Sequence, residues 1–319
     1  MSVKDIFRAM NLSKENAALA EDITNRSKKV ERDAKRLDKK YLKDLETSWD
    51  DALVPFAQLF GRIKNCDLSP VELSAGVPKA ARIDVETQKA SIDAFDGLVA
   101  LASGAGVGLA SSTATFAAVA TFATASTGTA IGSLSGAAAT SATLAWLGGG
   151  SLATGGLGVA GGTAVVAGVI AIPIFLVGGW FLSNAGSKEL KKQKKQSAEL
   201  TILENELLAA EEFMAKLDAA AAKSRLAIIK LRKMLIRLNA TLEATLDVHD
   251  DYRQFTDREK HRLGTQMNLS IALITLISTP LVVESKNKAG AVTSKVNPAV
   301  NKQVKAANAL IDASNGQGK

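Results

Sequence analysis

The residues that most directly suggest acid–base or metal chemistry in this chain are its two histidines, His249 and His261. His249 stands beside Asp250 and Asp251 in the segment DVHDDY, but the histidines are twelve residues apart and no third ligand accompanies them, so no zinc site is recognisable. The lone Cys66 excludes an intramolecular disulfide and a cysteine-based metal site within one chain. The sequence contains neither the glycine–lysine loop of a nucleotide site nor a nucleophile elbow. We therefore predict that the protein is not an enzyme and uses no metal and no cofactor.

A different pattern dominates the middle of the chain. Residues 97–187 contain no Asp, Glu, Lys, Arg or His, whereas about a quarter of the residues of an average domain are charged. An exposed surface of this kind would aggregate, so we expect a bilayer or a protein partner to cover it. A flexible low-complexity linker is the alternative. Large apolar residues such as Phe116, Phe122 and Leu147 interrupt the stretch too often for a solvated coil.

Glycines recur at intervals of four within this stretch. Residues four apart share one face of a helix, so such glycines form a groove in which another backbone can approach closely. This glycine-zipper spacing predicts helices that insert into a membrane and pack on one another. The residues expected to carry insertion and packing, with three accompanying aromatic residues, are Gly104, Gly108, Gly128, Gly132, Gly136, Gly158, Gly162, Trp146, Phe175 and Trp180.

The stretch divides into candidate membrane spans, each of which needs about 20 mainly apolar residues. Residues 163–182 meet this length, with Trp180 near the end where interfacial aromatics gather and with Pro173 as an expected kink. Residues 98–125 and 129–147 are weaker candidates because Ser and Thr dilute them. The glycines of 148–162 predict a hinge between the two halves of a hairpin.

Lysines follow the strongest candidate span directly. Side chains in this position can reach lipid phosphates, although the same lysines could simply form the polar start of a coiled coil. The net charge of +7 also favours an anionic surface, and the chain lacks the recognition modules and interleaved aromatics of nucleic-acid-binding proteins. We therefore expect an anionic bilayer as partner and no nucleic acid. The residues expected to meet lipid headgroups are Lys188, Lys191, Lys192, Lys194 and Lys195.

Two long amphipathic helices are expected on either side of the uncharged stretch. Apolar or neutral positions three and four apart predict one helix from Ser13 to Asn65, bent at Pro55, after a short amphipathic turn over Val3–Met10. A sustained heptad pattern predicts a second, coiled-coil helix that pairs antiparallel with the first or serves an oligomer. Its key positions are Leu200, Leu203, Leu207, Leu217, Ile228, Leu231, Leu235, Leu238 and Leu242.

The chain after this helix contains a second apolar run, from Leu269 to Val283, split by Pro280. It is short for a span, so we expect it to pack as core, with a membrane-surface role as the alternative. Residues 298–313 are expected to form one more helix. The predicted fold is all-α, an elongated antiparallel coiled-coil helical bundle carrying a long glycine-rich apolar helical hairpin. Its parts are 1–96 with the first long helices, 97–187 with the hairpin, 188–284 with the coiled coil, and 285–319 as a polar tail.

Long helices on both sides of a charge-free, glycine-rich hairpin resemble the α-helical pore-forming toxins of the cytolysin A type. The resemblance is architectural, covering roughly Ser13 to Leu276, and the Ala/Ser/Thr/Gly texture also looks like apolipoprotein L proteins. It implies a hairpin that is packed away in a soluble form, enters a bilayer and forms a homo-oligomeric pore, with or without a second protein component. A permanent integral membrane coiled-coil scaffold or effector is the alternative, and a wholly soluble helical bundle is a third possibility. Early acidic residues argue against a secretory signal, so we expect synthesis in the cytosol and location at a membrane.

Overall fold

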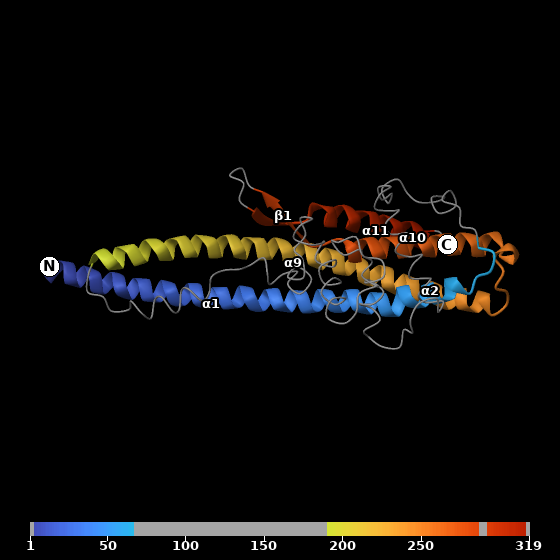
Figure 1. Ribbon diagram of the computed structural model, residues 1–319, viewed down its shortest axis with the longest axis horizontal. Coiled ribbons are helices and arrows are strands. Elements are labelled where there is room, and N and C mark those ends of the chain that lie inside the picture. Colours follow the sequence, from blue (N-terminus) through green and yellow to red (C-terminus); the bar gives the residue numbers. More distant parts are fainter. Residues whose placement is uncertain (1–2, 67–189, 287–291, 317–319) are drawn as a thin grey trace, which may run out of the picture. The chain divides into compact units, whose positions relative to one another are not determined.

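The computed structural model describes residues 3–66, 190–286 and 292–316 (Figure 1). Almost all of these residues are helical, which confirms the all-α class, and one two-stranded antiparallel sheet is added to the helices. The described residues divide between two compact units, residues 3–38 with 190–218, and residues 39–66 with 219–286 and 292–316. We call them the first and the second unit. The described elements are α1 (Val3–Ser48), a π-helical turn (Trp49–Leu53), α2 (Val54–Gly61), α9 (Leu190–Leu246), a 3₁₀ turn (Tyr252–Gln254), α10 (Asp257–Ser278), β1 (Val282–Lys286), β2 (Val292–Val296) and α11 (Pro298–Gly316).

Helix α1 begins ten residues earlier than the sequence pattern suggested. Ser13 was expected to cap the helix, but it lies inside one uninterrupted helix that starts at Val3. No glycine or proline separates Val3 from Ser13, so nothing in this stretch breaks the helical backbone. The apolar spacing also continues backwards to Ala9, which is fully buried. A serine is therefore a poor guide to a helix start when a helix-forming, amphipathic segment precedes it.

The expected disturbance at Pro55 takes the form of a change of helix type. The residues before it, Trp49–Leu53, form a π-helical turn, and α2 begins at Val54. Proline donates no backbone hydrogen bond and its ring collides with the carbonyl four residues earlier, so a wider turn relieves that clash without ending the chain of helices. Trp49, Leu53 and Phe56 remain buried on one side.

In the first unit, α1 and α9 pair in parallel. The amide of Asn16 donates to the backbone oxygen of Gln193 at 3.0 Å and to its side-chain oxygen at 3.1 Å. Ten residues further along α1, Arg26 contacts Glu211 through two hydrogen bonds of 3.0 and 2.6 Å. Both residue numbers increase together, so the helices run in the same direction. The buried apolar residues of this pair are Ala9, Ala20, Ile23, Val30, Ala34, Leu37, Leu200, Leu207, Met214 and Leu217.

The second unit independently has the same parallel pairing. The hydroxyl of Tyr41 lies 3.1 Å from that of Ser224, and Asn239 donates to the backbone oxygen of Ala52 at 3.0 Å. The prediction that the first long helix runs antiparallel to the heptad helix is therefore wrong. A heptad pattern specifies which face is buried, whereas direction depends on the polar pairs and on the connection. A connection as long as residues 62–189 does not force antiparallel neighbours, as a short one does.

Helix α10 runs antiparallel to α9 in the second unit and forms much of its core. A short connection separates the two helices, and Gln266 donates to Asn239 at 2.6 Å in the interior. Residues 269–277 are buried, so the expected core role of this apolar run is confirmed. Helix α11 follows as predicted, but the β-hairpin between α10 and α11 was not predicted. Figure 1 shows α11 lying beside α10. The last part of the chain is therefore not a purely polar tail, since it buries Val300, Val304, Ala306, Ala307, Leu310 and Ile311.

The candidate membrane spans over 98–125, 129–147 and 163–182, and the hinge over 148–162, lie outside the described residues. Within residues 3–66, 190–286 and 292–316, no helix combines the length and apolar character needed to cross a bilayer.

Candidate functional site

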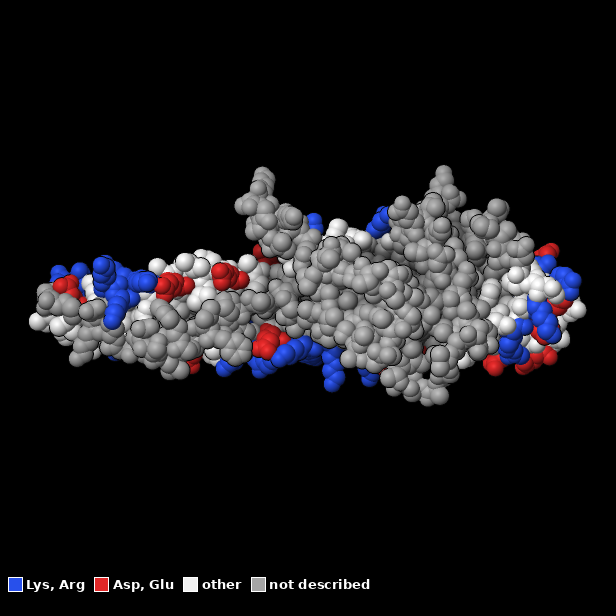
Figure 2. Space-filling view, viewed as in Figure 1, with Lys and Arg blue, Asp and Glu red and all other residues white. Residues whose placement is uncertain are grey.

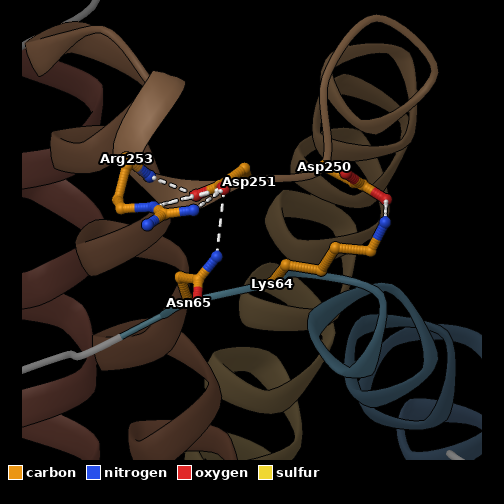
Figure 3. A network of polar contacts seen from close by, with 5 residues as sticks. All are labelled: Lys64, Asn65, Asp250, Asp251 and Arg253. Carbon is orange, nitrogen blue, oxygen red and sulfur yellow. Dashed lines mark hydrogen bonds and ion pairs between the residues drawn. The ribbon is translucent and has the colours of Figure 1, made fainter.

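Residues 62–66, which follow α2 in the second unit, are held by the loop between α9 and α10. The backbone N–H of Lys64 donates to the carbonyl of Asp250 at 2.7 Å, and the N–H of Tyr252 donates to the carbonyl of Lys64 at 2.9 Å. These bonds form a short parallel β-bridge. Asn65 adopts a positive φ of 52°, a left-handed conformation that asparagine tolerates better than most residues. We call this contact, drawn in Figure 3, the loop anchor.

Asp251 is the centre of the loop anchor (Figure 3). Its carboxylate accepts hydrogen bonds from the side chain of Arg253, from the backbone N–H of Arg253 at 3.0 Å, and from the side-chain amide of Asn65 at 3.0 Å. These donors favour the charged form and hold the pKa of Asp251 well below its usual range. Asp251 therefore stays ionised throughout the physiological pH range, and the anchor does not loosen through its titration.

Two ion pairs flank Asp251 in the second unit. The ammonium of Lys64 lies 2.8 Å from the carboxylate of Asp250, and this hydrogen bond raises the pKa of Lys64. The guanidinium of Arg62 lies 3.2 Å from the carboxylate of Asp247. Ion pairs this exposed to solvent contribute little to stability, so they support the backbone bridge but do not determine it. Together these contacts tie the described residues before position 67 to the α9–α10 loop.

His249, the residue considered for metal or base chemistry, packs in this same loop. Its ring lies edge-on to Phe255, with ring centres 5.4 Å apart, and its Nε2 is 3.5 Å from the carboxylate of Glu259. Glu259 belongs to the capping box that starts α10 with Thr256, and the Thr256 donors lower the pKa of this carboxyl. In the part of the chain that the structure describes, no three potential metal ligands converge. This geometry assigns His249 a packing role. His249 and His261 do not lie on the same helix, because α9 ends before His249 and α10 contains His261.

The opposite flank of the uncharged stretch is the first turn and a half of α9, in the first unit. Gln193 and Gln196 are buried there, and Asn16 of α1 contacts Gln193. The lysines of this segment alternate with the glutamines and point to solvent. They gather as a basic surface near the start of α9 (Figure 2), formed by Lys191, Lys192, Lys194 and Lys195.

The structure describes all nine key positions of the predicted coiled-coil helix. Leu200, Leu207 and Leu217 are buried in the first unit, and Ile228, Leu231, Leu235 and Leu242 in the second. Leu203 and Leu238 are half-buried, and none of the nine is exposed. Their side chains contribute to packing within a single chain. The remaining candidates lie outside the described residues: Gly104, Gly108, Gly128, Gly132, Gly136, Trp146, Gly158, Gly162, Phe175, Trp180 and Lys188.

The contacts of the loop anchor were not predicted from the sequence. The segment DVHDDYR was considered for metal binding, whereas its last aspartate, Asp251, caps the 3₁₀ turn and binds Arg253 and Asn65. A local signal was available, because an aspartate followed two residues later by a donor is typical of a capped turn. The distant partners Lys64 and Asn65 had no such signal.

Comparison of the chain with protein-family models, with curated proteins and with solved structures finds no match. Any function must therefore be argued from the residues themselves.

Proposed function

We propose that the protein is a membrane-inserting pore former. Residues 97–187 would enter the bilayer as a glycine-rich helical hairpin, and copies of the chain would assemble through the small-residue faces of its helices. The observation that carries this proposal is the absence of any ionisable side chain over 97–187, combined with glycines at intervals of four. In lipid, helices satisfy every backbone polar group, and small residues allow close packing between them.

Both described flanks of this stretch support the proposal. On one side, the loop anchor ties Lys64 and Asn65 to a packed helical unit. On the other side, α9 begins with solvent-exposed lysines, whose charge suits the phosphates at a bilayer surface. An inserting device requires a folded body that carries its membrane-active segment, and the loop anchor, which residues 67–96 separate from the stretch, belongs to such a body. In this proposal the long helices form a coiled-coil bundle, and several copies of the chain form a homo-oligomer.

The second candidate function is a permanent integral membrane scaffold without pore activity. The length of the charge-free stretch favours it, because 97–187 exceeds what one hairpin of two spans needs at about 20 residues each. In this alternative the paired helices α1 and α9 would stay on one side of the membrane and serve another protein.

Fractionation and dye release separate the two candidates. The full chain is expressed without detergent, soluble and membrane fractions are separated, and soluble protein is added to dye-loaded anionic liposomes. Pore formation predicts soluble protein that releases the dye. Protein found only in membranes and resistant to alkaline extraction would favour the permanent scaffold, and soluble protein inert toward liposomes would reject both.

A substitution in the zipper tests how the proposed pore assembles. Gly132→Leu fills the groove that a second helix would enter, so dye release and oligomer formation should be lost while the helical content of the remainder persists. Ala130→Leu adds a similar side chain about 200° away around the expected helix and serves as the matched control. Unchanged leakage and oligomer size in Gly132→Leu would reject the zipper. Equal losses in both variants would show that bulk alone, rather than this face, is responsible.

A further inference from the structure

A cavity of about 400 Å³ lies within the second unit, where α9, α10 and α11 meet. It is distinct from the loop anchor and plays no part in the proposed membrane insertion. Its volume falls within the range of about 300–1,000 Å³ that is usual for small-molecule sites. The lining residues are Met234, Arg237, Leu238 and Thr241 from α9, Arg258, His261, Arg262 and Thr265 from α10, and Ser314 and Asn315 from α11.

The spacing of these residues explains how they meet. On α9 and on α10 the lining positions are three and four residues apart, so each helix turns one face to the cavity. The two helices are antiparallel neighbours joined by the buried Asn239–Gln266 hydrogen bond, which aligns the two faces. The last turn of α11 contributes Ser314 and Asn315. Arg237, Arg258 and His261 are exposed, so the cavity opens to solvent. Met234 is buried and Leu238 half-buried, and they provide an apolar part of the wall.

The charge of the cavity is one-sided. Three arginines, Arg237, Arg258 and Arg262, line it together with His261, and none of the described lining residues is an aspartate or a glutamate. Among the described residues, none of these three guanidinium groups forms an ion pair with a carboxylate. Arg258 and Arg262 are also four residues apart on one helix, a placement that is unfavourable for like charges. An anion in the cavity would attract both guanidinium groups and so offset their repulsion.

The available hydrogen-bond donors narrow the class of anion. The hydroxyls of Thr241, Thr265 and Ser314 donate to carbonyls of their own helices, at 3.2, 3.0 and 2.8 Å. Beside the N–H groups of His261 and Asn315, the three guanidinium groups are the donors that always carry charge, and their planar forks match the oxygens of a phosphate bidentately. A phosphoryl group, with close to two negative charges and three acceptor oxygens, uses several arginines better than one carboxylate does.

We propose that this cavity binds the phosphoryl group of a small phosphate monoester, with the organic part of the ligand lying against Met234 and Leu238. The phosphoryl group could belong to a soluble organic phosphate or to the headgroup of a phosphomonoester lipid. Arg237 on α9 and Arg262 on α10 hold it from two sides, so the ligand bridges two helices of the second unit.

Binding of inorganic pyrophosphate to the full chain tests the site. Titration calorimetry compares the unmodified chain with the double variant Arg237→Gln/Arg262→Gln. The matched control, Arg32→Gln/Arg36→Gln, removes the same charge from exposed positions on α1 in the first unit. We expect affinity to fall about tenfold or more in the cavity variant, since charge-assisted hydrogen bonds are lost, and about twofold or less in the control. Circular dichroism and thermal unfolding check that both variants fold.

Two results would overturn the proposal: no saturable pyrophosphate binding by the unmodified chain, or equal losses in the cavity and control variants. A second comparison identifies the source of the phosphoryl group. Glycerol 3-phosphate represents the soluble class, and phosphatidylcholine vesicles containing phosphatidic acid represent the lipid class, with phosphatidylserine vesicles as a control for negative charge. Loss of glycerol 3-phosphate binding in the cavity variant supports the soluble class, and selective loss of binding to phosphatidic acid vesicles supports the lipid class. Neither readout depends on dye release, so the pore proposal and this one fail separately.

Discussion

The two units of the chain use the same helices, α1 and α9, in the same parallel orientation, but they bury different residues. In the first unit half of the described buried apolar residues of α1 are alanines, Ala9, Ala20 and Ala34, and the pair also buries the polar Asn16 and Gln193. In the second unit the continuation of these helices buries Trp49, Leu53 and Phe56, and α10 and α11 add further cover. Helix formation is thus common to both units, and the depth of the core distinguishes them.

This difference has an energetic consequence. A helix is stabilised mostly by packing of its apolar face rather than by its own hydrogen bonds, and apolar burial contributes about 25 cal/mol per Å². The described part of the first unit offers each helix a single partner, whereas α9 in the second unit also contacts α10 through Asn239 and Gln266. The first unit should therefore open at a lower free energy than the second.

The largest effect that tests this comparison comes from matched core truncations. Leu207 in the first unit and Leu235 in the second are both fully buried positions of α9. Leu→Ala substitutions in cores cost about 2–5 kcal/mol, with the larger values where the surroundings cannot collapse into the cavity. We expect Leu235→Ala near the top of this range and Leu207→Ala near the bottom. Urea unfolding followed by circular dichroism measures both, and a larger loss for Leu207→Ala would refute the ranking.

The sequence correctly predicted which side chains are buried, because burial depends on one face of a helix alone. The spacing of Ile23, Val30 and Leu37, and the heptads of α9, identify side chains that are buried. The apolar run around Leu273 is likewise core, as its length indicated. These successes have one physical origin, since a periodic apolar face must be covered whichever partner covers it.

What the sequence did not provide is the identity and direction of the partner. An apolar stripe is equally satisfied by parallel and antiparallel neighbours, and the parallel choice depends on distant polar pairs such as Asn16 with Gln193 and Tyr41 with Ser224. The loop anchor and the arginine cavity are further cases, because each joins residues far apart in the chain. Arg237 and Arg262 belong to different helices, and only the antiparallel pairing of α9 and α10 brings them to one cavity.

The pH dependence of stability should show a smaller effect of a buried carboxyl group in the first unit. Asp38, in the first unit, is half-buried with its Oδ1 lacking a hydrogen-bond partner among the described residues, and burial raises its pKa from 3.8 to about 6. The folded chain therefore holds a proton that the unfolded chain releases, so this residue lowers stability as the pH rises from 3.8 to about 6. Asp38→Asn should stabilise the protein at neutral pH by about 1 kcal/mol, allowing for solvent screening of a half-exposed group.

The same substitution should have little effect below the pKa of the unfolded carboxyl, where Asp38 is neutral in both states. Thermal unfolding of Asp38→Asn at neutral and at acidic pH measures this difference. Asp33→Asn, at an exposed position of the same helix, is the control and should show no such pH dependence. Equal stabilisation by Asp38→Asn at both pH values would contradict a buried, ionised carboxylate as the cause.

The smallest expected effect concerns the ion pairs that link α1 to α9 in each unit. Arg26 contacts Glu211 through two nitrogens, with exposed side-chain fractions of 26% and 34%, whereas Arg225 contacts Asp44 with fractions of 28% and 17%. Double-mutant cycles using Gln and Asn replacements should give couplings of about 0.5–1 kcal/mol for each pair, because both are only partly shielded from water. Salt should weaken the Arg26–Glu211 coupling more, since its carboxylate is the more exposed of the two. If both couplings resist salt equally, the first unit shields its polar contacts as well as the second does, and the difference between the units rests on apolar packing alone.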